Sequence, residues 1–519
     1  MSEPFYITTA IAYPNGKPHI GHAYEAIATD AIARFQRLMG RDVCFLTGTD
    51  EHGLKMDQTA RAAGKETREL ADEMSAYFRE MCAKLDISFD HFCRTTADSH
   101  HAASQALWKR LEASGDLYLD RYEGWYSVRD EAFYDEKELV DGEGDTKLSP
   151  QGTPVEWTTE ETWFFRLSKY EKRLLELYEN QPDFIRPDSR RNETIRFVEG
   201  GLRDLSVSRT SFDWGVKVPG SEDHVMYVWL DALTTYISGI GFPDDTEEWR
   251  KYWPASVHII GKDIVRFHAV YWPAFLMSAG LPLPKQIFGH GFLLSRGEKM
   301  SKSLGNVVDP MELADRYGVD ALRYFLLREV SFGQDGSYSA EAIVTRVNAE
   351  LANSFGNLAQ RTLSMIYKNL DGKLPALPES FEEALEVAAV KSECLRALDA
   401  FQDFSFSQGL DIWIQAVYTC NKWIDEMGPW SLKKTDPEKM EWVLSRLYLA
   451  IRDLAITVIP IIPKSAHKLL DQMGVAPDQR HYEHLKGEAW YNDLRLSGFI
   501  LPAPAPLFPR LEMSTDEME

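Results

Sequence analysis

The sequence predicts an α/β chain in which a parallel sheet is divided by an inserted segment and is followed by an all-helical bundle. Three observations lead to this prediction. Strand-like and helix-like segments alternate over residues 5–85, which is typical of a parallel sheet. Residues 118–220 interrupt the alternation with aromatic and turn-rich sequence, after which short apolar runs resume. Beyond residue 345, apolar residues recur at helical spacing.

Composition and charge exclude several classes of protein. The chain has 519 residues, 44% hydrophobic and 26% charged, which fits a globular protein of several domains. It carries 57 basic and 80 acidic residues, so it repels polyanions as a whole, and we expect no DNA partner. No apolar run is long enough to span a bilayer, and residues 1–4 carry no basic leader. We therefore expect a cytoplasmic protein that does not bind a membrane.

The five cysteines of the chain are scattered over distant segments and show no CxxC spacing. Free cysteine is among the most buried residue types, so the expected state is a reduced and mostly buried thiol. These cysteines are Cys44, Cys82, Cys93, Cys394 and Cys420.

The first strand and helix meet at a turn that suits an anion. Residues 5–11 alternate and are rich in β-branched residues, whereas residues 22–39 carry apolar side chains at helical spacing and stop at Gly40. The first N–H groups of such a helix lack partners, and its dipole favours negative charge. Gly21 leaves room for a ligand against the backbone, while His19 and His22 supply imidazole donors. Alternatively, Gly21 relieves crowding and the two histidines are half-exposed polar residues.

A second strand, residues 42–46, leads to a turn that contains Asp50, and residues 66–85 form the next expected helix. Ligands of parallel sheets sit at the carboxyl ends of the strands, where both turns fall. A carboxylate at that edge suits an ammonium group. Its alternative role is to cap the following helix.

Residues 122–140 look strand-like, 141–154 turn-rich and 160–177 helical. A basic segment follows, which is either a solvated face or an RNA contact. Its basic residues are Arg186, Arg190, Arg191 and Arg196. After this segment, sheet-like runs return at residues 226–232 and 256–263.

Two lysines three apart, Lys299 and Lys302, stand on a small-residue loop flanked by Gly297 and Gly305. Such a pair brings two mobile charges to one polyphosphate. The alternative is a solvated surface loop.

The pair of motifs His19-Ile20-Gly21-His22 and Lys299-Met300-Ser301-Lys302-Ser303 resembles the two signatures of class I aminoacyl-tRNA synthetases. Further segments resemble the methionyl-tRNA synthetases, and the similarity runs from about residue 5 to residue 511. These segments are residues 12–16, 48–53, 204–209, 227–232 and 261–264.

The resemblance implies a Rossmann-type catalytic domain and a two-step reaction. Methionine and ATP give methionyl-adenylate and pyrophosphate, and the methionyl group then passes to the terminal ribose of tRNA(Met). The substrate carboxylate is already ionised at neutral pH, so the first step needs positioning and charge neutralisation instead of a general base. Magnesium is expected with ATP. No appended dimerisation module is evident, so we expect a monomer.

The resemblance also implies site residues. The catalytic residues would be His19, His22, Lys299 and Lys302, and Gly21 and Ser301 would join them in binding ATP. The residues implied for methionine are Ile11, Tyr13, Asp50, Trp229, Ala232, Tyr236, Asp263, Ile264 and His268, with Asp50 on the ammonium group. Three of them have a purely structural alternative: core packing for Trp229 and Tyr236, and an interior histidine with its hydrogen bonds satisfied for His268.

The chain departs from the zinc-bearing members of this family. Where they have paired cysteines in the insertion, Ser127 and Asp130 stand at the expected ligand positions. A hydroxyl and one carboxylate are poor zinc ligands. We therefore predict no structural zinc, and expect aromatic packing by Trp125, Tyr126 and Phe133 to hold this region together.

In the C-terminal third, Val347, Leu351, Leu358 and Met365 fall at helical spacing. The resemblance makes this bundle the anticodon-binding domain. Its implied contacts are Asn357 and Arg361, which share a helix face, and Trp430 as a stacking platform. The alternatives are a solvated polar pair and a buried tryptophan.

We expect six regions along the chain. The catalytic domain comprises residues 1–117 and 221–292, divided by a connective insertion at 118–220. A stem-contact region with the lysine loop, residues 293–345, precedes the helical domain at 346–470. Residues 471–519 would pack back over it and end in a disordered tail.

The sequence argues against three rival interpretations. A cysteinyl enzyme would use cysteine and histidine ligands for a catalytic zinc, and these are absent. The related isoleucyl, valyl and leucyl enzymes carry a large editing insertion. Here only about 100 residues separate the two sheet halves, which is too short for the additional domain that editing would need. A non-catalytic tRNA-binding paralogue would show erosion of the phosphate and ammonium contacts, yet His19, His22, Asp50, Lys299 and Lys302 are all present.

Overall fold

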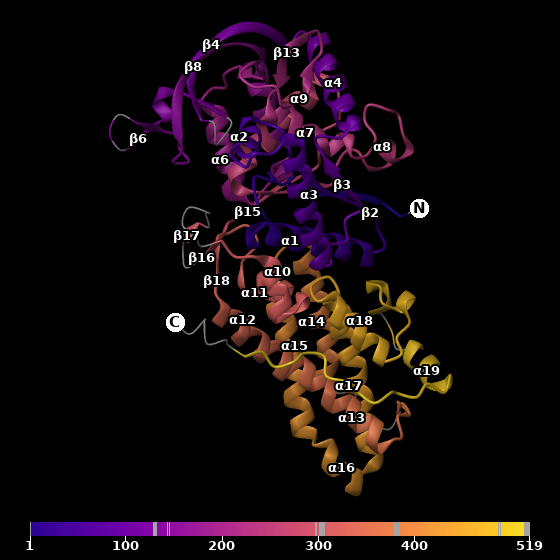
Figure 1. The fold of residues 1–519 in the computed structure, drawn as a ribbon. Coiled ribbons are helices and arrows are strands. Elements are labelled where there is room, and N and C mark those ends of the chain that lie inside the picture. Colours follow the sequence, from indigo (N-terminus) through magenta and orange to yellow (C-terminus); the bar gives the residue numbers. More distant parts are fainter. Residues whose placement is uncertain are drawn as a thin grey trace.

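The computed structural model describes residues 2–127, 132–142, 144, 146–295, 298–299, 307–377, 385–485, 487 and 489–512. The molecule is elongated. In Figure 1 the α/β part and the inserted segment lie at the top, and the helical bundle extends below them to helix α16 (Pro429–Thr435) at the tip. The first helix, α1 (Ile20–Leu38), lies where the two parts meet.

A six-stranded sheet forms the centre of the α/β part, and all of its strand pairings are parallel. The predicted parallel sheet is thus confirmed. The first strand pairs on one side with the strand that follows α1 and on the other with a strand from beyond the insertion, so the two halves of the sequence are neighbours in space. In sheet order the strands are β3 (His91–Arg94), β2 (Asp42–Thr49), β1 (Pro4–Thr9), β14 (Val257–Gly261), β15 (Ile287–His290) and β9 (Ile185–Arg186).

One expected strand is a helix. Residues 256–263 contribute β14 as predicted, but within residues 226–232 the chain enters helix α7 (Val228–Ser238). The preceding β13 (Ser221–Met226) belongs to a separate three-stranded sheet with β11 (Ser208–Arg209) and β12 (Lys217–Val218). A short apolar run that is buried on all sides has no periodicity to separate strand from helix, which explains the error.

The insertion is built on a long antiparallel pair, β4 (Leu117–Ser127) and β8 (Pro154–Phe165). The expected helix over residues 160–177 is wrong at its start, because residues 160–165 belong to β8 and the helix α5 (Glu171–Asn180) begins later. Threonine and aromatic residues favour the strand there, and Phe164 lies opposite Tyr118 with stacked rings. In the first half of the chain, the helix expected over residues 66–85 is present as α3 (Thr67–Lys84), and a short additional helix, α2 (Leu54–Ala62), comes before it.

Helix α6 (Asp188–Glu199) carries three of the four arginines of the basic segment. Arg190 pairs with Glu193 at 2.8 Å, and Arg191 donates to the Pro182 carbonyl at 3.0 Å. The Arg190 and Arg191 side chains are only 17 and 24% exposed, so these two arginines are held by contacts within the chain and do not form a solvated face.

The C-terminal part is all-helical, as predicted, and shares one buried apolar cluster with the lower face of the sheet. That cluster runs from Ile27 of α1 to Trp413 and Ile451 in the bundle. All five cysteines are free thiols, four of them buried, as expected. The bundle helices are α12 (Ala340–Arg346), α13 (Asn357–Asn369), α14 (Leu385–Gln402), α15 (Phe406–Met427), α17 (Pro437–Thr457) and α18 (Pro463–Gln472), with a π-helical stretch at 347–356.

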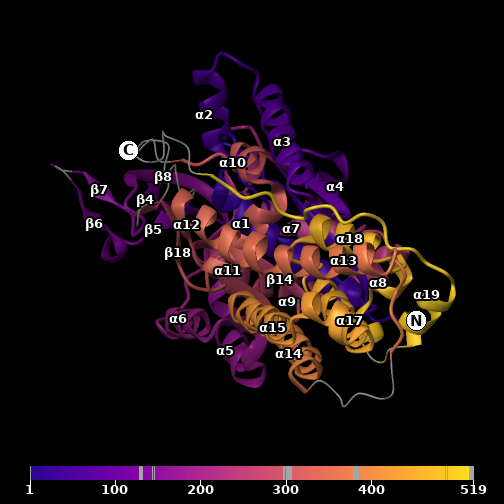
Figure 2. The ribbon, with the colours of Figure 1, turned by 90° about the horizontal axis from the view of Figure 1, so that it is seen from below.

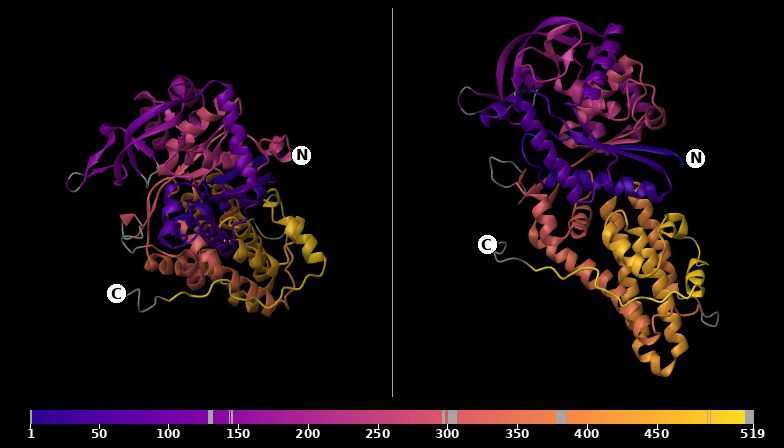
Figure 3. Two further views of the ribbon diagram at one scale, coloured as in Figure 1. Left: turned by 45° about the horizontal axis from the view of Figure 1, so that its top comes forward. Right: turned by 45° about the vertical axis from the view of Figure 1, so that its right-hand side comes forward.

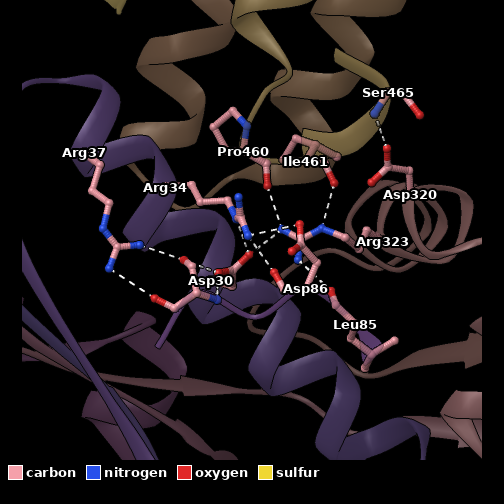
Figure 4. Close-up of polar contacts among 11 residues, drawn as sticks. Asp30, Arg34, Arg37, Leu85, Asp86, Asp320, Arg323, Pro460, Ile461 and Ser465 are labelled. Atoms are coloured by element: carbon pink, nitrogen blue, oxygen red, sulfur yellow. Dashed lines mark hydrogen bonds and ion pairs between the residues drawn. The ribbon is translucent and has the colours of Figure 1, made fainter. Parts of the chain in front are cut away.

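A buried arginine joins the two parts (Figure 4). Arg323, on helix α11 (Val319–Glu329), is fully buried and lies 2.6 Å from the equally buried Asp30 of α1. The same guanidinium donates to the carbonyls of Pro460 and Ile461, at 2.9 and 3.0 Å, between α17 and α18. Burial acts to raise the pKa of Asp30, but Arg323 and Arg34 outweigh it, so that pKa is lowered.

The C-terminal segment runs back across the bundle, as the yellow trace in Figures 2 and 3 shows. Lys468 donates to the Pro506 carbonyl at 3.2 Å, and Asn348 and Leu511 exchange hydrogen bonds at 2.8 and 2.9 Å. The expected disorder of residues 514–519 lies outside the described residues. In the described part of the chain, no helix combines the length and apolar character needed to cross a membrane.

Candidate active site

A cavity of about 450 Å³ opens at the carboxyl ends of the central strands. Its wall comes from the end of β1, the start of α1, the turn after β2, helix α7, residues 261–268 and the end of β15. All nine residues implied for methionine line it, together with His19, Gly21 and His22. Ser301 and Lys302 lie outside the described residues, as does the side chain of Lys299, whose backbone belongs to β17 (Glu298–Lys299).

The two motif histidines cap helix α1 reciprocally. The His19 Nδ1 atom accepts from the Gly21 N–H at 3.1 Å, and the His22 Nδ1 atom accepts from the His19 N–H at 3.1 Å. In a neutral imidazole with Nδ1 as acceptor, the ring proton is on Nε2, which makes Nε2 a donor. A Cβ on Gly21 would lie 2.9 Å from the His19 ring, so glycine is required for this cap.

The turn after β2 places Asp50 at the cavity wall. Backbone hydrogen bonds of 2.9 Å join Asp50 and Gly48 to Ala12, which lies between Ile11 and Tyr13. Helix α2 begins at Leu54 with Gly53 at its N-cap position and no side-chain cap. Asp50 therefore does not cap the next helix, and the residue is buried in the cavity wall, with 8% of its surface exposed.

An aromatic pocket forms the other end of the cavity. The rings of Trp229 and Phe267 stack at 3.8 Å between centroids, with an interplanar angle of 4°. The Ile264 carbonyl accepts from Nδ1 of His268 at 2.9 Å, so Nε2 of that ring accepts from the Tyr236 hydroxyl at 2.7 Å. Burial lowers the pKa of His268 to about 4, which keeps this pocket uncharged at neutral pH.

Sequence reasoning missed an ion pair in the same wall. Nε2 of His290, at the end of β15, donates to the Glu25 carboxylate at 2.8 Å, and Nδ1 donates to the Gly291 carbonyl at 2.8 Å. Burial acts to lower the pKa of His290, but the Glu25 carboxylate outweighs it and that pKa is raised. The helical signal was present, because Glu25 follows His22 by three residues and so shares its face of α1.

Among the described residues, one group has the ligand types and spacing to hold a metal ion: Cys44, His91 and Glu248. His91 Nε2 lies 2.6 Å from the Glu248 carboxylate, so these two side chains satisfy each other. Burial raises the pKa of the Cys44 thiol, which keeps it protonated. None of the three lines the cavity.

The residues implied for tRNA gather at the opposite end of the molecule. The Arg361 guanidinium lies 5.3 Å from the centre of the Trp430 ring and pairs with Asp425 at 2.6 Å. Asn357, one turn before Arg361 on α13, is exposed. Trp430 is 52% exposed, so the alternative of a buried tryptophan is wrong.

Comparison with known proteins agrees with this geometry. Residues 5–363 match the family model described as tRNA synthetases class I (M), and residues 393–517 match the anticodon binding domain of methionyl tRNA ligase. The methionine–tRNA ligase of Brucella suis is 57% identical over 98% of both chains, and that of Mycobacterium tuberculosis strain CDC 1551 is 56% identical over 98% of both.

Solved structures agree as well. The methionyl-tRNA synthetase of Mycobacterium tuberculosis in complex with methionyl-adenylate has a TM-score of 0.94 and 55% identity, over 98% of this chain and 100% of that one. The apo form of the Mycobacterium tuberculosis enzyme has a TM-score of 0.87 and 51% identity, over 99% of both chains. This chain therefore belongs to the methionyl group of the class I tRNA synthetase family.

Proposed function

We propose that this protein attaches methionine to its tRNA in two steps. Methionine and ATP react to form methionyl-adenylate and pyrophosphate, and the methionyl group is then transferred to the terminal adenosine ribose of tRNA(Met). The observation that carries the proposal is a single cavity that joins the capped start of α1 to an uncharged aromatic pocket, with the Asp50 carboxylate in the same wall.

In the first step, a carboxylate oxygen of methionine attacks the α-phosphorus of ATP, and the bond to the pyrophosphate oxygen breaks. Asp50 binds the α-ammonium group, which leaves the methionine carboxylate directed at the ATP. A methionine thioether is polarizable and apolar, so it suits the faces of Trp229 and Tyr236 in the neutral pocket. His268 orients the Tyr236 hydroxyl, while Ile11, Tyr13, Ala232, Asp263 and Ile264 complete the wall.

At the phosphates, positive charge and hydrogen-bond donors would stabilise the reacting groups. The start of α1 offers a positive dipole end, and His19 and His22 present Nε2 as a donor. Gly21 permits the cap, and Lys299, Ser301 and Lys302 would follow charge onto the leaving pyrophosphate. ATP enters as its magnesium complex, in which the metal neutralises phosphate charge.

The insertion is proposed to hold without zinc. Ser127, at one expected ligand position, is buried and lies 2.7 Å from the Thr153 hydroxyl, which in turn lies 2.8 Å from Ser149. Hydroxyls bonded to one another are poor zinc ligands, and Trp125 packs edge-on against Trp157 nearby. Asp130 lies outside the described residues. Metal analysis of the purified protein tests this proposal, and stoichiometric zinc would contradict it.

We further propose the expected domain boundaries, with β9 of the insertion returning to the central sheet, a monomeric state and a cytoplasmic location. Asn357, Arg361 and Trp430 are assigned to the tRNA anticodon, because Arg361 and Trp430 combine hydrogen-bond donors with an exposed aromatic face.

Amino-acid-dependent exchange of pyrophosphate into ATP, measured across the standard amino acids, tests the activity. We expect exchange with methionine and little with leucine or valine. His22→Ala should lower the rate roughly 100-fold or more, because a donor aimed at developing phosphate charge is lost. Exchange driven by leucine or valine would overturn the specificity, and none with any amino acid would favour a non-catalytic paralogue.

A further inference from the structure

The turn after β2 directs three successive side chains to three different places. Asp50 lines the cavity. Glu51 is fully buried and accepts two hydrogen bonds from Arg94, at 2.6 and 2.8 Å. His52 is buried, and its Nδ1 atom lies 2.5 Å from the Asp231 carboxylate. The two residues that follow Asp50 therefore fix the turn through separate buried contacts.

Asp231 connects three elements at one buried carboxylate. Its Oδ2 atom is bonded to His52 of the turn, and its Oδ1 atom lies 2.6 Å from Nε2 of His100 on helix α4 (Asp98–Ala113). Helices α4 and α7 pack side by side (Figure 1). Burial acts to raise the pKa of Asp231, but the two histidines outweigh it and lower that pKa. An ionised carboxylate with two ring N–H donors has a definite geometry.

Helix α7 also carries the wall of the aromatic pocket. Trp229, Ala232 and Tyr236 follow one another at helical spacing on one face and line the cavity, whereas Asp231 belongs to another face. The His52–Asp231 hydrogen bond thus joins the turn that carries the ammonium-binding carboxylate to the helix that carries the thioether pocket.

We propose that His52 and Asp231 are positioning residues for methionine, whose hydrogen bond sets the distance between the ammonium site at Asp50 and the thioether pocket on α7. This inference rests on the proposed function. The fixed distance would select an amino acid whose side chain spans both sites at once. Loss of the bond would loosen recognition of methionine without altering the ATP end of the cavity, which is built on α1.

The test compares His52→Leu with His52→Asn in pyrophosphate exchange. An asparagine amide can place an N–H donor near the position of the histidine Nδ1 atom, whereas leucine fills the space without a donor. For His52→Leu we expect the KM for methionine to rise roughly 10-fold or more, since small misplacements of a substrate are costly. The KM for ATP should stay within about 2-fold, and His52→Asn should recover most of the loss.

Two further variants support the comparison. Asp231→Asn removes the shared charge and should also raise the KM for methionine selectively, with less than additive effect when combined with His52→Leu. His101→Asn is the matched control, because the His101 ring lies 5.2 Å from the His52 ring but is not bonded to Asp231. It should leave both KM values unchanged. Thermal unfolding shows whether each variant is folded. If Asp231→Asn does not fold, the comparison of His52→Leu with His52→Asn alone tests the proposal.

The outcomes separate this inference from the proposed function. If the unaltered protein exchanges with methionine but His52→Leu keeps its methionine KM, or loses methionine and ATP recognition equally, the positioning role is wrong. A selective rise that asparagine reverses would support it. Absence of methionine-dependent exchange in the unaltered protein would instead contradict the proposed function itself.

Discussion

At the scale of single residues, the site depends on which ring nitrogen of each histidine carries a proton. His19 and His22 accept at Nδ1 from the backbone, so Nε2 is their donor. His268 has the opposite arrangement, because its Nδ1 atom donates to a carbonyl. Histidine thereby supplies hydrogen-bond donors at the phosphate end of the cavity. At the amino-acid end it supplies an acceptor for the Tyr236 hydroxyl.

Acid should destabilise the protein through His268. Its pKa is about 4 in the folded protein, against about 6.5 in an unfolded chain, so below pH 6.5 the unfolded state binds more protons. Stability is therefore lost as the pH falls from 6.5 to 4, by at most roughly 3.5 kcal/mol from this group. Urea unfolding at several pH values, with His268→Gln, should show a shallower loss for the variant. An equal loss in both proteins would contradict the neutral buried ring, and His484→Gln, at a histidine whose side chain is 31% exposed, serves as control.

Sequence reasoning found the residues of the amino-acid pocket but not their partners. Trp229, Tyr236 and His268 were identified through the family resemblance, and all three line the cavity. The stacking of Phe267 on Trp229 and the pairing of His290 with Glu25 join residues that are far apart in the chain. Nothing in local spacing reveals such pairings, because they depend on how the strands are ordered in the sheet.

At the scale of elements, the structure agrees with the sequence where periodicity is long and differs where runs are short. Helix α1 and strand β1 were predicted to within a few residues, because amphipathic spacing and alternation continue over several turns or pleats. The run that opens α7 is short and almost entirely buried, so its sequence carries no clear periodicity, and in the structure it packs as a helix against α4.

The connection between α1 and the bundle should depend on Arg323. Arg323→Met leaves Asp30 buried beside Arg34 alone, and we expect a loss of roughly 3–5 kcal/mol in the free energy of unfolding. Arg37→Met is the control, because Arg37 lies on α1 like Asp30 but its ion pair with Asp90 is largely open to solvent, with side chains 31 and 44% exposed, and should contribute less than about 1 kcal/mol. Denaturant unfolding measures both. Equal, small effects would show that the buried pair does not hold the two parts together.

At the scale of the whole molecule, the two candidate recognition sites lie at opposite ends. The cavity opens in the α/β part, while Trp430 stands on α16 at the far tip of the bundle (Figure 1). The net charge of -23 repels RNA, so binding must rest on local contacts such as Arg361 with Trp430.

Trp430→Ala should separate the two ends functionally. Loss of a stacking platform costs about 1–3 kcal/mol per base, so the KM for tRNA should rise roughly 10-fold or more while pyrophosphate exchange is unchanged. Aminoacylation and exchange assays on the same preparation measure the two effects. Trp157→Ala, which removes another exposed tryptophan from the insertion, controls for surface changes. An equal loss of exchange and charging would contradict a role confined to tRNA.

The central claim is that one cavity holds methionine and ATP against each other. A stable sulfamoyl analogue of methionyl-adenylate, which joins both halves in one molecule, tests it by inhibition of pyrophosphate exchange. The account predicts competition with methionine and with ATP alike, and affinity at least roughly 100-fold above that of methionine alone, because the two binding contributions are linked. Competition with only one substrate would contradict the claim, because it would place the two substrates in separate sites.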